Sequence, residues 1–193
     1  MRKNDTLYRM IIAAMLMAIG MVLPKLLGGV QVVGQAISPL HIIALIAGLT
    51  LGGLWGGIVG LACPLLGHFF FSAPPSIDKA LPMAFECRAY GVITGLLYPL
   101  LRRMMAGKPV LLPLLTAQIT AMFLGRVVGG AAKALLLAAG AIQANEAFTF
   151  AAFISSYFVS TAVGAVLHII IVPAVVAALE KARLSPVGRE LSA

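Results

Sequence analysis

The sequence predicts an all-α membrane protein, a six-transmembrane-helix bundle with both termini cytoplasmic. Hydrophobic residues make up 61% of the 193 residues and charged residues only 10%, against about a quarter charged in an ordinary soluble domain. The apolar residues are gathered into six runs, most of them near the ~20 residues that a helix needs to cross a bilayer core. The basic residues stand at the ends of these runs, as orientation in a membrane requires.

The first span is expected over residues 7–27, behind a short basic lead. A secretory signal peptide is the alternative, because a basic start, an apolar run and a small-residue site at residues 33–36 fit one. Basic residues also flank the later apolar runs, which favours a first span that is retained in the mature protein. A loop bearing Gln31 and Gln35 follows.

The second and third spans, at residues 40–53 and 54–71, are short for helices perpendicular to the membrane. Glycines at small-xxx-small spacing let helix backbones approach closely, so we predict a tightly packed helical hairpin. These glycine pairs are Gly48/Gly52, Gly53/Gly57 and Gly56/Gly60.

The fourth span, residues 81–101, follows a polar Pro-containing loop at residues 72–80 and contains Glu86 and Arg88. Each charge at membrane depth costs roughly 2.5–3.5 kcal/mol on insertion scales, so such residues default to a functional role. Glu86 and Tyr90 are four residues apart and share one helix face. This face is expected to wall a small-molecule pocket, with Arg88 pointing elsewhere.

The fifth span is expected over residues 111–140 and the sixth over residues 148–179, joined by a loop at residues 143–146. The fifth is longer than the bilayer core, so it should tilt or project. No internal repeat or soluble domain is visible, and residues 1–193 are predicted to form a single integral membrane domain.

The charge distribution orients the bundle. With the N-terminus inside, the outer side holds only Lys25 and Lys79 among the basic residues at span ends. The inner side holds Arg2, Lys3, Arg9, Arg102, Arg103, Lys108, Lys181, Arg183 and Arg189. This asymmetry follows the positive-inside rule and puts both termini in the cytoplasm.

With this orientation, polar residues from five spans share one depth in the outer half. The candidate substrate-binding residues are His41, His68, Glu86, Tyr90, Arg126, Lys133, Tyr157 and Thr161. An outward-opening cavity lined by Glu86, Arg126 and Lys133 would suit a polar organic solute bearing a carboxylate, because cationic side chains form charge-assisted hydrogen bonds with it. His168 is expected to lie deeper, out of reach of the other histidines.

The alternative for Glu86, His41 and His68 is a purely structural role. Glu86 could form an ion pair with Lys133 or Arg126 that serves only the fold. His41 and His68 could be hydrogen-bonded helix-end residues.

Several function classes lack support in the sequence. The charge of +8 is not gathered on one face, so nucleic acid is not an expected partner. No GxxxxGK[ST] or HExxH motif occurs, and Cys63 and Cys87 lie inside spans, so no cofactor or metal is predicted.

Several motifs together resemble a known family. They are the AMLMA segment at residues 14–18, the SPLHI segment at residues 38–42, the glycine-rich stretch at residues 48–60, the Pro74-Pro75 loop, and the pattern Glu86, Tyr90-Gly91, Gly95 and Tyr98. With the six-span plan, they resemble the S components of energy-coupling-factor (ECF) transporters, which capture vitamins at the cell membrane of bacteria and archaea. The metal-ion branch of that family begins with a Met-His motif, whereas this chain begins Met1-Arg2-Lys3.

The resemblance implies a substrate-binding subunit without catalysis of its own. Ala14 and Ala18 would dock a transmembrane T subunit, and two cytoplasmic ATPases would drive uptake. The cationic candidates favour an acid such as pantothenate or niacin. The alternatives are a stand-alone proton-coupled secondary transporter using Glu86, an intramembrane enzyme, and a purely structural membrane subunit.

Overall fold

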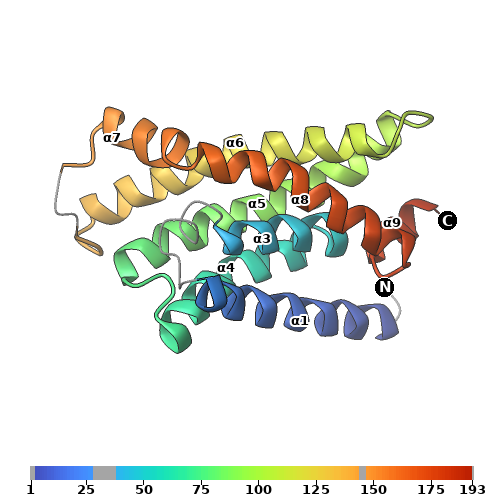
Figure 1. Cartoon of the computed structure of the whole chain (residues 1–193), viewed down its shortest axis with the longest axis horizontal. Helices are drawn as coiled ribbons and strands as arrows, with labels where there is room; N and C mark the ends of the chain where they lie inside the picture. Colours follow the sequence, from blue (N-terminus) through green and yellow to red (C-terminus); the bar gives the residue numbers. More distant parts are fainter. Residues whose placement is uncertain (1–2, 28–37, 144–146, 193) are drawn as a thin grey trace.

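The computed structural model describes residues 3–27, 38–143 and 147–192, which contain helices and no strand. The helices pack side by side with their long axes roughly parallel, and both ends of the chain lie at the same end of the bundle (Figure 1). They are α1 (Lys3–Leu27), α3 (Pro39–Leu51), α4 (Gly53–Phe71), α5 (Ile77–Met104), α6 (Leu111–Ala138), α7 (Phe150–Ile154), the π-helix η1 (Ser155–Val159), α8 (Ala162–Lys181) and α9 (Pro186–Ser192). The predicted loop residues Gln31 and Gln35, and residues 144–146, lie outside the described ranges.

Four helical stretches of the described chain are long and apolar enough to cross a membrane: Asp5–Pro24, Gly53–Phe71, Leu111–Ala138 and Phe150–Lys181. α3 is a shorter apolar helix. α5 is not among the four, because Glu86 and Arg88 interrupt its apolar character. The chain is therefore a multi-pass membrane protein.

The short helix α3 lies at the centre of the bundle (Figure 1). All of its residues are buried, and it contacts α1, α4, α5 and α8. Thirteen residues span only about 20 Å at 1.5 Å each. The short length is compatible with a membrane because neighbouring helices, rather than lipid, surround α3.

Glycines bring the backbones of α3, α4 and α5 into contact. A Cβ atom at Gly56 would lie 2.5 Å from the Cα of Gly48, and one at Gly60 would collide with the Cys87 carbonyl. The predicted close packing of α3 on α4 is therefore present. Gly91 and Gly95 of α5 make the reciprocal contacts, each meeting the α4 backbone; they have the same spacing of four residues, but no such pair was predicted there.

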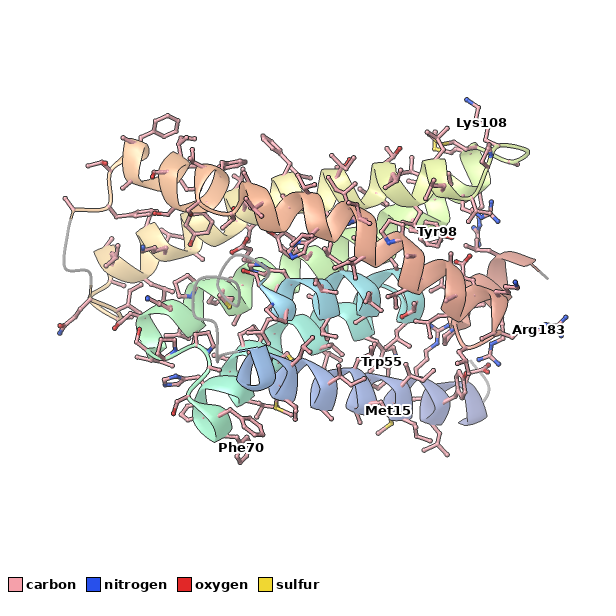
Figure 2. All side chains as sticks on the ribbon, in the orientation of Figure 1. Met15, Trp55, Phe70, Tyr98, Lys108 and Arg183 are labelled. Atoms are coloured by element: carbon pink, nitrogen blue, oxygen red, sulfur yellow. The ribbon has the colours of Figure 1, made fainter. Side chains whose placement is uncertain are left out.

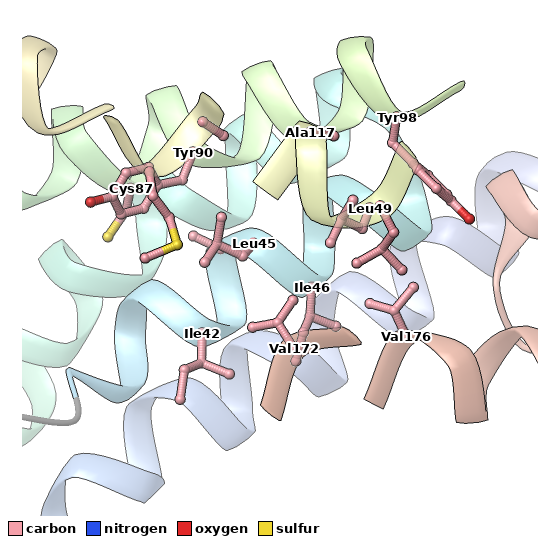
Figure 3. Close-up of a cluster of buried hydrophobic side chains, with 14 of the residues drawn as sticks. Ile42, Leu45, Ile46, Leu49, Cys87, Tyr90, Tyr98, Ala117, Val172 and Val176 are labelled. Carbon is pink, nitrogen blue, oxygen red and sulfur yellow. The ribbon is translucent and has the colours of Figure 1, made fainter. Parts of the chain in front are cut away.

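The larger apolar core lies between α3, α5, α6 and α8 (Figure 3). Lipid tails are as apolar as these side chains, so close packing rather than water exclusion stabilises such a core. Its members include Ile42, Leu45, Ile46 and Leu49 of α3, Cys87, Tyr90 and Tyr98 of α5, Ala117 of α6, and Val172 and Val176 of α8.

The C-terminal helix α9 closes the end of the bundle that holds both termini. Arg9 of α1 is only 5% exposed, and its guanidinium donates hydrogen bonds to the Leu51 carbonyl and to the Glu190 carboxylate. Tyr8 donates to the Leu184 carbonyl at 3.3 Å. Arg9 thus joins α1, α3 and α9, a role that its place in the basic N-terminal lead did not predict.

The sixth apolar run is not one continuous α-helix. It is divided into α7, η1 and α8, and the π turn is closed by a hydrogen bond from the Ser160 amide to the Ser155 carbonyl at 2.9 Å. π-Helical turns are rare and frequently occur at functional sites. This one carries Tyr157, which the sequence analysis placed in the predicted pocket.

Candidate functional site

Glu86 and Tyr90 form the centre of a buried polar cluster. The Tyr90 hydroxyl donates a hydrogen bond to Oε1 of Glu86 at 2.5 Å, as the spacing of four residues on one helix predicts. The two residues are 6% and 2% exposed. Both lie in the half of α5 that begins at the end of the bundle opposite the termini (Figure 1).

His41 of α3 faces this pair. Its Nε2 is 3.7 Å from Oε2 of Glu86 and has no hydrogen-bond partner. Its ring meets the Tyr90 ring edge-on, with 5.3 Å between the centroids. The His41 and His168 rings are also edge-on, at 6.1 Å.

The contact with His168 corrects the expectation that this residue lies too deep to meet the others. Because α3 is short and central, His41 stands inside the bundle rather than near its outer surface. α8 packs against α3 and brings His168 to the same level.

Two glycines of α6 allow the neighbouring helices to approach the cluster. A Cβ at Gly129 would lie 2.8 Å from the Glu86 Cβ and 3.1 Å from the Tyr157 ring, and one at Gly125 would collide with the Tyr90 ring. The Tyr157 hydroxyl donates to the Gly129 carbonyl at 3.2 Å. The sequence analysis missed both glycines, although their spacing of four residues is the small-xxx-small signal that it used for α3 and α4.

Gln118 of α6 adds a buried side-chain amide that was not predicted as a site residue. Its Nε2 donates to the His168 carbonyl at 2.7 Å, while its Oε1 is buried without a partner. Gln118 is fully buried. On an α-helix, residues seven and eleven apart share a face, so Gln118 lies on the same face of α6 as Gly125 and Gly129.

The two cationic candidates pack on aromatic rings beside the cluster. The Lys133 Nζ lies 4.6 Å from the Phe148 ring centroid, and the Arg126 Cζ lies 5.5 Å from that of Phe158. Arg126 directly follows Gly125, which packs against the Tyr90 ring. Within the described chain, Glu86 comes within 4.0 Å of neither cation, and its close ionisable neighbour is His41.

Thr161 and His68 make local contacts. The Thr161 hydroxyl donates to the Tyr157 carbonyl at 2.6 Å, which secures the end of the π turn. The His68 Nδ1 donates to the Pro74 carbonyl at 2.7 Å, and its ring packs edge-on against Phe69. These contacts of His68 are those of a hydrogen-bonded helix-end residue.

The polar cluster is closed in this structure, because its members are each less than a tenth exposed. The two clefts found in the described part of the chain are not lined by Glu86, Tyr90 or His41. A groove of about 330 Å³ runs between α6 and α7 and is lined by apolar residues, among them Phe148, Phe150 and Phe153. Among the described residues, no group of three or more His, Cys, Asp or Glu side chains could hold a metal ion.

The predicted docking residues Ala14 and Ala18 are exposed on α1. Met15 beside them points away from the bundle (Figure 2) and is 60% exposed. The face of α1 that carries both alanines is therefore apolar and exposed.

Comparison with known proteins gives one family. The chain matches the family model described as "ECF transporter, substrate-specific component" over residues 8–179. No curated protein matches, and no solved structure matches.

Proposed function

Because the chain belongs to the family of substrate-specific components of ECF transporters, we propose that it captures one vitamin or related small polar organic solute at the outer face of the cell membrane. Members of this family are transporter components rather than enzymes. In this proposal the chain performs no catalysis, and partner ATPases supply the energy for uptake.

The buried cluster of Glu86, Tyr90 and His41 is the observation that carries the proposal. A carboxyl group at membrane depth is costly and is normally paired with a cation when its role is structural. Glu86 instead contacts a hydroxyl and an imidazole whose nearest nitrogen has no hydrogen bond. Polar groups of α3 and α5 that meet at such a carboxyl group, with His168 of α8 packed against His41, support a solute site.

The solute in this proposal bears a carboxylate, as pantothenate and niacin do. Arg126 directly follows Gly125 at the cluster, and Lys133 lies further along the same helix. Both cations are held over aromatic rings, contacts that are individually weak at partly exposed sites. They could therefore turn toward an anionic ligand at modest cost.

The proposal also includes the orientation and partners of the chain. Lys108 and Arg183 lie at the end of the bundle that holds both termini (Figure 2). Six crossings with both termini cytoplasmic would place these two residues on the inner side of the membrane, as the positive-inside rule requires. The exposed face around Ala14 and Ala18 would dock the transmembrane T subunit, and two ATPases would bind on the cytoplasmic side. The host would be a bacterium or an archaeon.

Mass spectrometry of small molecules that co-purify with the detergent-extracted chain tests the proposal directly. We expect one polar organic solute at near-stoichiometric amount. Recovery of no solute, together with no binding from a nutrient extract, would reject a capture role and favour a structural subunit.

Uptake measurements separate the stand-alone proton-coupled carrier from the proposed subunit. The proposal predicts that cells expressing the chain lose uptake when the partner ATPases are deleted. Uptake that persists without them and follows the proton gradient would favour the carrier.

A further inference from the structure

We infer that Oε2 of Glu86 and Nε2 of His41 together hold a neutral hydrogen-bond donor of the solute, a hydroxyl or an amide N–H group. This inference rests on the proposed function and adds to it the chemical class of the solute. The transported molecule would carry such a group in addition to the carboxylate that the cations recognise.

The two atoms are placed for a bridging group. Oε1 of Glu86 is occupied by the Tyr90 hydroxyl, whereas no donor among the described residues hydrogen-bonds Oε2. The distance from Oε2 to Nε2 of His41 is 3.7 Å, which is too long for a direct hydrogen bond. A hydroxyl oxygen about 2.8 Å from both would donate to Oε2 and accept from Nε2 when Nε2 carries the ring proton, and an amide N–H group would donate to one of the two atoms.

Burial makes the unpaired Nε2 of His41 informative. The side chains of His41 and Glu86 are only 9% and 7% exposed, so bulk solvent does not compensate them. A buried polar atom without a partner pays its full desolvation cost, and such atoms in a folded protein call for a specific explanation. A donor brought by the solute supplies the missing partner.

Gln118 indicates that the surroundings accept rather than donate hydrogen bonds. Its Nε2 is held by the His168 carbonyl, so an amide flip would break this bond. Oε1 therefore remains an acceptor, and it is buried without a partner. This second acceptor lies on the cluster-facing side of α6.

A neutral hydroxyl fits the two atoms better than an ammonium group. An ammonium group only donates hydrogen bonds, so it leaves Nε2 of His41 unpaired whenever that atom carries the ring proton. A hydroxyl group can donate to Oε2 of Glu86 and accept from Nε2.

Calorimetric titration of the detergent-solubilised chain with two probe acids tests the inference. Pantothenate carries hydroxyl and amide N–H donors as well as a carboxylate, whereas niacin at neutral pH carries a carboxylate and no such donor. We expect pantothenate to bind at least about 10-fold more tightly, because a site built for a donor discriminates strongly against a ligand that lacks it. Equal or tighter binding of niacin overturns the inference.

Variants assign this discrimination to the two atoms. We expect Glu86→Gln to weaken pantothenate binding by about 10-fold or more, since it removes the charge-assisted bond, and to change niacin binding less than about 3-fold. Glu180→Gln is the matched control, because Glu180 also accepts a tyrosine hydrogen bond, from Tyr98 at 2.7 Å, but at the other end of α5. His41→Phe keeps the ring packing and should reproduce the selective loss if Glu86→Gln fails to fold. An equal loss for both probes overturns the inference.

The co-purified solute provides an independent readout. A solute without O–H or N–H groups would overturn this inference and leave the proposed function standing. If the wild-type chain retains no solute and binds neither probe, the proposed function is rejected together with the inference.

Discussion

Removal of the Arg9 guanidinium should loosen α1 from the bundle. The variant Arg9→Met keeps most of the side-chain stem but deletes the hydrogen bonds to the Leu51 carbonyl and the Glu190 carboxylate. α1 also contacts α3 and α4 along a strip that includes Ala13 and Gly20, and Tyr8 contacts Leu184 and Arg189 at the C-terminal end. In a membrane, where apolar contact gives little net attraction between helices, polar contacts of this kind matter most.

The expected loss follows from the two contacts. Leaving the carbonyl at the end of α3 buried and unpaired costs about 1–3 kcal/mol. The ion pair adds about 0.2–1 kcal/mol, because the Glu190 side chain is 63% exposed. The buried charge itself is unfavourable, and its Nε has no partner, which offsets part of the loss. We therefore expect Arg9→Met to lower the free energy of unfolding by about 1–3 kcal/mol.

Unfolding in mixed micelles, followed by tryptophan fluorescence, measures this change. Trp55 is the single tryptophan of the chain and packs in the cluster that contains Ala13 of α1 (Figure 2), so its emission reports on the attachment of α1. Glu190→Gln should cost at most about 1 kcal/mol. Arg103→Met, at an exposed arginine, should cost less than about 0.5 kcal/mol. Equal effects of Arg9→Met and Arg103→Met would refute the reasoning.

Three further predictions follow. Gly91→Val should abolish folding or cost more than about 3 kcal/mol, because a Cβ there collides with the α4 backbone and overpacked backbones cannot relax cheaply; thermal unfolding of the purified chain measures this, and a native melting temperature would contradict it. Arg126→Ala and Lys133→Ala should each lower the affinity for a carboxylate-bearing solute about 10-fold; unchanged affinities in calorimetry would show that the carboxylate argument is wrong. Ala14→Trp and Ala18→Trp should abolish co-purification with a T subunit and leave solute affinity unchanged; retained assembly would move the docking surface elsewhere.

The sequence was sufficient for the class of the protein and for its local pairs. Runs of apolar residues predicted helices, and the described chain contains helices and no strand. The family resemblance is confirmed by the match over residues 8–179. The Glu86–Tyr90 hydrogen bond also follows from spacing alone, because residues four apart on a helix are neighbours wherever the helix lies. The number of crossings and the position of the termini stay predictions.

Contacts between helices were harder to predict from the sequence. Sequence position put His168 too deep to meet His41, whereas their rings are 6.1 Å apart. The error came from treating each run as a full crossing, which makes depth proportional to position along the run. α3 is short and enclosed, so that proportion does not hold for His41.

The sequence by itself therefore determined the features that depend on helix period and on the membrane as solvent. These are a multi-pass membrane chain, pairs on one helix face such as Glu86 with Tyr90, and glycines that permit close packing. Tertiary structure alone decided which helices share those glycines, that Arg9 is buried against α9, and that an unpaired nitrogen of His41 stands opposite a carboxyl oxygen of Glu86. The physical reason is that helix period is a local property, whereas the rotation and depth of one helix against another depend on how all their side chains pack together.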